Sequence, residues 1–193
     1  MEKRKEVPII EIGKVKVRHD RIVVEYKEKH RDENYVDIVT KQCENIIHTD
    51  LKLAMQMLKP HVVSICEFAE AERVDVSNPS ENDIQVLKGY VVTGYSRGGS
   101  EDNAGVTIVA QKLLSSGRVM NITTPFTKFF DETGEGYCYG DELRDVLSRI
   151  EYEVDAYLFE GKFGIKQESF DFAEDDVPVE EICVLLKTFL HHV

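Results

Sequence analysis

The chain has 193 residues, with 24 lysines and arginines against 36 aspartates and glutamates, and its formal charge is −12. This balance excludes a broadly basic nucleic-acid coat protein. With 42% hydrophobic and 31% charged residues, the composition is that of a folded chain, not a disordered one. The length fits one domain, which we expect over residues 1–167, followed by an acidic hinge at 168–178 and an amphipathic helix at 179–193.

The negative charge lies in one part of the sequence. Residues 131–181 contain 17 acidic and 4 basic side chains, whereas residues 1–130 contain 19 of each. The first two thirds of the chain are therefore neutral and remain compatible with an anionic ligand. The acidic stretch is therefore the first place in the chain to look for a bound cation or a basic partner.

The chain has no sequence signal for secretion or for a membrane. Its charged start is not followed by an apolar stretch, and the longest apolar run, 182–186, is far below the roughly 20 residues of a membrane span. The scattered cysteines contain no CxxC pair, which predicts neither a zinc cluster nor a disulfide framework. They are Cys43, Cys66, Cys138 and Cys183. We expect a cytoplasmic, non-secreted protein.

The first third of the sequence predicts strands. Alternation over 9–26 predicts a β-hairpin with its turn at His19 and Asp20. The charged residues 27–34 predict a loop or the end of a strand, and 35–39 a further short strand.

The next segment predicts a helix and then a strand. Apolar residues recur at helical spacing over 47–58, and Pro60 is expected to stop this helix. The β-branched residues of 62–68 favour a strand, with a second helix as the alternative. Residues 78–83 predict a loop.

The centre of the chain predicts an antiparallel meander. Residues 84–95 form a long β-rich run, and 106–114 and 119–122 predict two strands whose turn uses Gly117 at a positive φ. Residues 96–100, rich in glycine and serine, are expected to form a hairpin tip, with presentation of backbone N–H groups to an anion as the alternative.

The last third predicts helices. An apolar stripe over 143–158, with Asp141 as a possible cap and Gly161 just after its end, indicates a long amphipathic helix. A short strand is expected within 161–172 and a final helix at 179–192. The fold class is thus α+β, with an antiparallel sheet of about five to seven strands (an N-terminal hairpin plus a central meander) packed by two or three helices.

Residues 131–142 resemble the calcium loop of the EF-hand family. The loop positions that carry oxygen ligands are occupied by Asp131, Thr133, Glu135 and Glu142, and a glycine stands at the sharp turn. The resemblance implies calcium binding. The family places Asp or Asn where Thr133 and Glu135 stand, and it needs a helix before the loop, where this sequence predicts a strand. The alternative is an acidic, glycine-rich loop that starts a helix, and no other cofactor is expected.

Five cations and several aromatic residues in the β-rich centre suggest a single-stranded nucleic-acid surface. The cations are Lys88, Arg97, Lys112, Arg118 and Lys128. Scattered surface charge is the alternative. No cysteine or serine pairs with a histidine at a catalytic spacing, so the sequence favours a protein without enzymatic activity.

The sequence favours a non-enzymatic accessory or assembly protein that acts through protein–protein contacts, of a kind suited to a phage or mobile element. Docking or self-association is expected through the apolar side of the final helix, formed by Ile182, Leu185, Leu186, Phe189 and Leu190. The alternative is that this helix packs onto the core of its own chain. The alternatives are a single-stranded nucleic-acid-binding accessory protein regulated by its acidic C-terminal region, and a hydrolase or metal-dependent enzyme without a recognisable signature.

Overall fold

A computed structural model describes residues 9–30, 35–130 and 136–165 of the chain. The strands are β1 (Ile9–Arg18), β2 (Arg21–His30), β3 (Tyr35–Gln42), β4 (Tyr90–Gly98), β5 (Gly105–Leu113), β6 (Val119–Thr123) and β7 (Thr127–Lys128). The helices are α1 (Thr49–Gln56), α2 (Lys59–Ile65), α3 (Glu81–Val86) and α4 (Gly140–Asp155), with short helical segments η1 (Ala69–Arg73), η2 (Glu101–Asn103) and η3 (Ala156–Glu160).

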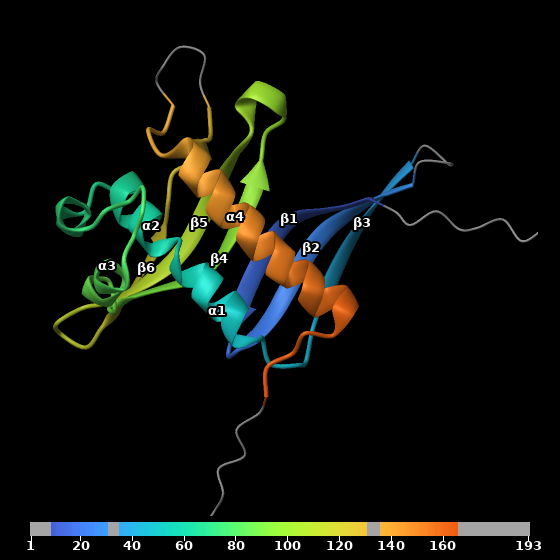
Figure 1. Cartoon of the computed structure of the whole chain (residues 1–193), viewed down its shortest axis with the longest axis horizontal. Helices are drawn as coiled ribbons and strands as arrows, with labels where there is room; N and C mark the ends of the chain where they lie inside the picture. The colour runs from blue at the N-terminus through green and yellow to red at the C-terminus, as the bar shows by residue number, and fades with distance from the viewer. Residues whose placement is uncertain (1–8, 31–34, 131–135, 166–193) are drawn as a thin grey trace, which may run out of the picture.

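One antiparallel sheet organises the molecule. Its strand order is β3-β2-β1-β4-β5-β6, and β7 pairs with β5. Helices α1 and α4 lie across one side of this sheet (Figure 1). The predicted α+β class, strand number and central meander are confirmed.

The sheet consists of two halves of similar topology. Each half begins with three consecutive antiparallel strands and ends in a helix on the same side: β1, β2 and β3 precede α1, and β4, β5 and β6 precede α4, with the short β7 inserted before α4. The first strands of the two halves, β1 and β4, meet antiparallel at the centre. The halves are joined there by a short pairing of Lys14–Lys16 with Gly94–Ser96.

The core lies between the sheet and the helices. Buried sheet residues such as Val15, Tyr95 and Ile108 alternate with exposed ones, as expected for a sheet with one side in the core. Helix α4 buries a stripe spaced by three or four residues, namely Leu143, Leu147, Ile150 and Val154. The stripe predicted from the sequence is therefore confirmed.

The N-terminal hairpin forms as predicted, and its second strand is longer than expected. His19 and Asp20 have φ angles of 50° and 59°, the left-handed values required by a tight two-residue turn between twisted strands. Strand β2 continues to His30 and pairs with β1 and β3 on its two sides. The charged residues after Tyr26 remain in the strand because every second side chain points into solvent.

The strand expected over 62–68 was wrong, because α2 occupies Lys59–Ile65. Pro60 lies in the first turn of this helix, where its missing N–H is not needed, so it begins a helix as well as following one. His61, Val62 and Val63 are all buried. A helix buried around most of its circumference lacks the amphipathic period on which the sequence prediction depended.

The segment between η1 and β4 also differs from the prediction. Residues 81–86 form helix α3, capped by Ser80, whose hydroxyl accepts from the N–H of Asp83 while the Asp83 carboxylate accepts from the N–H of Ser80. Strand β4 therefore starts at Tyr90, and the β-rich run predicted from residue 84 was wrong at its start.

Towards the C-terminal part, Gly161 has a φ of 74° and ends the helical segment after α4, as predicted. The short strand expected within 161–172 is, in the described residues, a single bridge between Ile47 and Phe163. The hinge at 168–178 and the helix at 179–193 lie outside the described residues. Of the helices described, none has the length and apolar character to cross a membrane.

Candidate functional site

The side of the sheet that faces away from α1 and α4, here called the uncovered face, exposes apolar side chains. Ile38 of β3 is 70% exposed, Val91 of β4 55% and Val109 of β5 39%. Val119 at the start of β6 is exposed on the same side. These residues alternate with the buried ones along each strand, so the exposure follows from the strand register.

Strands β1 and β2 add positive charge to the uncovered face. Five of their outward cations, here called the basic cluster, are Lys14, Lys16, Arg18, Lys27 and Lys29. Arg21, also outward, forms an ion pair with Glu44. Lys29 forms an ion pair with Glu11, with Nζ and Oε2 2.5 Å apart. Lys14, Lys16 and Lys27 form no ion pair with any carboxylate in the described part of the chain. Glu11 and Glu25 lie on the same face, opposite Lys27 and Lys14 in the strand register. The face therefore combines an excess of cations over carboxylates with exposed valines and isoleucine.

Within the described strands, the uncovered face carries no aromatic side chain. Tyr26, Tyr90 and Tyr95 all point into the core. Tyr35 lies opposite His30, on the helix side of β3, and stacks on its ring. Outside the strands, the ring of Phe126 lies over Gly98 and Gly105 on this face and is 48% exposed. Nonspecific binding of single strands relies on several aromatic side chains on which successive bases stack, and the strands of this face supply none.

A cleft opens at the centre of the sheet, where β1 and β4 diverge beyond the Lys14–Ser96 pair. Its volume is about 720 Å³, and its walls come from both strands and from the β4–β5 turn. Strand β2 also contributes to the lining, which holds both charges: Lys27 and Lys29 together with Glu11, Glu25 and Glu101. The hairpin tip predicted at 96–100 therefore borders a cavity.

Arg97, which lines the cleft, forms an ion pair that joins the sheet to α4. Arg97 Nε donates to Glu151 Oε1 at 2.5 Å, and the Tyr95 hydroxyl donates to the same oxygen at 3.4 Å. Burial raises the pKa of Glu151, while the Arg97 guanidinium opposes this shift. The Arg97 guanidinium also lies 5.5 Å from the centre of the Phe129 ring. Each charged group has its partner within the protein, as is typical of an ion pair with a structural role.

The structure does not bring the five predicted nucleic-acid cations onto one surface. Arg97 and Lys112 point to the helix side, where Lys112 pairs with Glu70 at 2.6 Å. Lys88 and Arg118 are exposed in turns, and Lys128 is half-buried in β7. The basic cluster was missed, although the alternation of the first hairpin already places Lys14 and Lys16 on one side of β1.

Most of the calcium-loop candidates, Asp131, Thr133 and Glu135, lie outside the described residues. Glu142 lies in the first turn of α4, and β7, not a helix, is the element described before the loop. The docking residues predicted in the final helix, Ile182, Leu185, Leu186, Phe189 and Leu190, also lie outside the described residues.

The described histidines and cysteines form no nucleophile–base pair within the described ranges. His61 is buried, and its Nδ1 lies 3.2 Å from the hydroxyl of Tyr137. Burial lowers the pKa of His61 to about 4 and raises the pKa of the Cys66 thiol. Both groups are thereby kept uncharged at neutral pH, as suits core residues.

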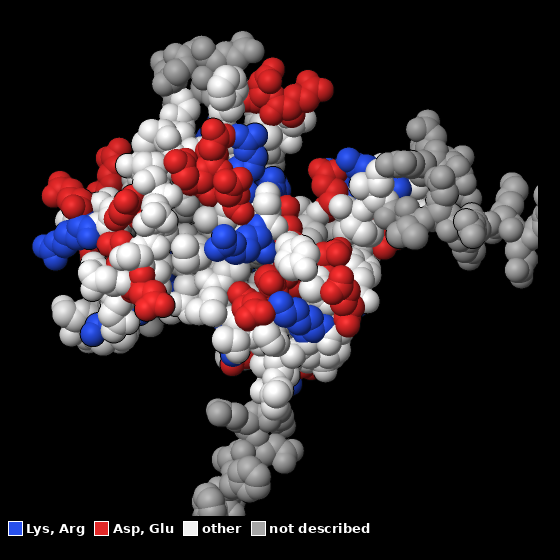
Figure 2. All heavy atoms as spheres, in the orientation of Figure 1, with Lys and Arg blue, Asp and Glu red and all other residues white. Residues whose placement is uncertain are grey.

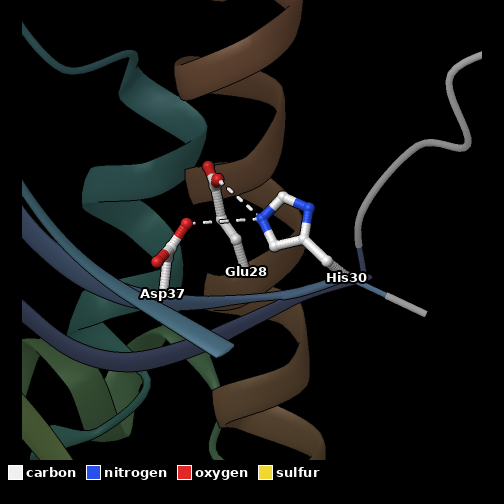
Figure 3. Close-up of side chains that lie close together, drawn as sticks. All are labelled: Glu28, His30 and Asp37. Atoms are coloured by element: carbon white, nitrogen blue, oxygen red, sulfur yellow. Dashed lines mark ion pairs between the residues drawn. The ribbon is translucent and has the colours of Figure 1, made fainter. Parts of the chain in front are cut away.

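A different group of side chains has the composition of a metal site. Glu28 and His30 of β2 and Asp37 of β3 point to a common centre (Figure 3). His30 Nε2 lies 3.8 Å from Glu28 Oε2 and 3.5 Å from Asp37 Oδ2. Sequence reasoning missed this group because Asp37 meets Glu28 only through the register of β2 and β3.

Comparison with known proteins adds no assignment. No family model matches the chain, and no curated protein or solved structure matches it either.

Proposed function

We propose that this protein is a non-enzymatic accessory or assembly protein that acts through protein–protein contacts. In this proposal the uncovered face of the sheet binds the acidic C-terminal residues 168–193 of a second copy. The observation that supports it is the combination, on one face, of unpaired lysines with exposed valines and isoleucine.

Charge complementarity supports this choice of occupant. Residues 168–193 contain seven acidic side chains and a single lysine, together with apolar residues at helical spacing. The acids match the basic cluster, and the apolar residues match the exposed side chains of Ile38, Val91 and Val109.

The alternative of two uncovered faces packed symmetrically against each other is disfavoured. A twofold contact that sets the β1–β2 half of one face against the same half of the other brings the two basic clusters together, and like charges repel. The helix side of the molecule carries many carboxylates with fewer cations between them (Figure 2). Contacts between copies are therefore favourable where the basic cluster of one meets acidic residues of the other.

The test is the molar mass of the full chain, measured by light scattering and sedimentation velocity over a wide range of protein concentration. We expect association that is lost in Lys14→Glu/Lys16→Glu/Lys27→Glu. The matched control Lys41→Glu/Lys88→Glu/Arg118→Glu makes the same change of net charge at exposed cations outside the basic cluster and should still associate. A fluorescent peptide of residues 168–193 should bind the wild-type chain and not the basic-cluster variant.

A wild-type chain that stays monomeric at all concentrations overturns the proposal. So does association that the control variant weakens as much as the basic-cluster variant. A labelled single-stranded oligonucleotide is tested in parallel. Binding of the oligonucleotide through the basic cluster, without binding of the peptide, would identify a nucleic-acid-binding protein instead.

A further inference from the structure

We infer that Glu28, His30 and Asp37 form a binding site for a divalent transition-metal ion. The site is separate from the uncovered face, because these side chains point to the helix side of the sheet at the far end of β2 and β3 (Figure 3). The inference is independent of the proposed docking function.

The backbone fixes the three side chains in this arrangement. Glu28 and His30 are two residues apart in β2 and so point to the same side. Asp37 lies directly opposite Glu28 in β3. The His30 ring is held by stacking on Tyr35, with ring centres 4.6 Å apart and planes at 25°.

The distances suit a shared ion better than hydrogen bonds. Ligand atoms bound at the usual lengths to a tetrahedral ion lie about 3.4 Å apart. The Nε2–oxygen separations of 3.5 Å and 3.8 Å are close to this value, and the ligand atoms all lie within 4.8 Å of one another. Both separations exceed the normal length of an N–H···O hydrogen bond.

The environment of His30 Nε2 is a second observation in favour of a bound metal ion. This atom is buried and has no hydrogen-bond partner among the described residues. A buried polar atom without a partner is costly, and a metal bond would satisfy it. The Nε2 lone pair is also the usual metal ligand of a neutral imidazole.

The ligand set indicates the class of ion. Imidazole suits Zn²⁺, Ni²⁺, Cu²⁺ or Fe²⁺, whereas Mg²⁺ and Ca²⁺ prefer oxygen ligands alone. Two carboxylates and one neutral imidazole balance a charge of two, and three protein ligands leave a position for water or for a further ligand. Glu28 and His30 side chains are 26% and 28% exposed, and Asp37 is 57% exposed, so an ion can reach the site from solvent.

The test is a Zn²⁺ titration of the full chain in competition with a chromophoric chelator, with Mg²⁺ and Ca²⁺ as comparison ions. We expect one Zn²⁺ per chain, with affinity reduced roughly tenfold or more in each of Glu28→Gln, His30→Gln and Asp37→Asn. Co²⁺ in place of Zn²⁺ should give visible absorption bands that His30→Gln removes. Unchanged far-ultraviolet circular dichroism and melting temperature show that each variant remains folded.

Two controls separate this site from other histidines. His48→Gln removes the imidazole that lies 3.3 Å from Asp50, and His191→Gln/His192→Gln removes the C-terminal pair. Both variants should bind Zn²⁺ as the wild type does. Binding that survives in folded His30→Gln, or that is lost in either control, overturns the inference, as does the absence of Zn²⁺ binding by the wild type.

Discussion

Arg97 in β4 and Glu151 in α4 are joined by a hydrogen bond of 2.5 Å between Nε and Oε1. Their side chains are 27% and 24% exposed, so the pair lies mostly out of solvent, with Arg97 at the wall of the central cleft. It connects the long helix to the sheet next to the point where β1 and β4 diverge. The stability of this part of the molecule should therefore depend on both partners together.

Arg97→Met should destabilise the fold, because it leaves the Glu151 carboxylate half-buried without its partner. We expect a loss of about 2–3 kcal/mol in the free energy of unfolding, measured by urea denaturation, since loss of one partner of a fully buried pair costs more. The double variant Arg97→Met/Glu151→Leu removes both charges and should recover most of this loss. Equal losses of unfolding free energy in the single and double variants would show that the unpaired charge of Glu151 is not the cause.

His61 should make stability depend on pH. Burial lowers its pKa from 6.5 to about 4 in the folded chain, so between these values the unfolded chain binds a proton that the folded chain does not. Stability contributed by neutral His61 is complete above pH 6.5 and is lost as the pH falls towards 4, by on the order of 3 kcal/mol.

The check is urea denaturation of wild type and His61→Gln across this pH range. The variant should show a shallower loss of stability because glutamine does not titrate. The carboxylates that also titrate in acid are common to both proteins. Parallel curves of unfolding free energy against pH would therefore contradict the assignment of this pH dependence to His61.

Gly94 should not tolerate a side chain. It lies in the pairing of β1 with β4, where an added Cβ would overlap the carbonyl oxygen of Val15. Gly94→Ala should cost about 2 kcal/mol or more in the free energy of unfolding, because the two strands would have to separate. Gly89→Ala is the matched control, since its Cβ would lie 3.6 Å from the nearest atom, an ordinary contact.

If the basic cluster binds the acidic segment of a second copy, association should weaken as salt is added. Exposed charges are screened over about 8 Å at physiological ionic strength and over shorter distances at higher salt. The molar mass measured by light scattering should therefore fall between low and high NaCl at fixed protein concentration. Association that strengthens with salt would indicate a contact dominated by apolar burial.

The elements predicted well from the sequence are those with one side in solvent. The first hairpin and α4 show clear periods of two and of three to four residues because their exposed positions are polar. Helix α2 is buried at Pro60, His61, Val62 and Val63, and its period is therefore absent from the sequence. Helix α3 is short, and the signal that marks it is the Ser80–Asp83 cap rather than a hydrophobic pattern.

The candidate sites were less accessible to prediction because they depend on register. A bulge between Val92 and Gly94 changes the phase of β4, so that Arg97 points to the helix side. Glu28 and Asp37 meet only because β2 and β3 pair with one particular offset. Which side of the sheet stays uncovered depends on where α1 and α4 pack, and strand alternation alone does not determine this.

The short pairing of Lys14–Lys16 with Gly94–Ser96 has a consequence for how the chain folds. Apart from the short β5–β7 pair, the other strand pairs among the described residues connect strands that are consecutive in the sequence, and such contacts form early because they close small loops. The β1–β4 pairing closes a loop of about eighty residues, a larger entropic cost. Formation of this central pairing should therefore limit the folding rate, and Gly94→Ala should slow refolding more than Gly89→Ala.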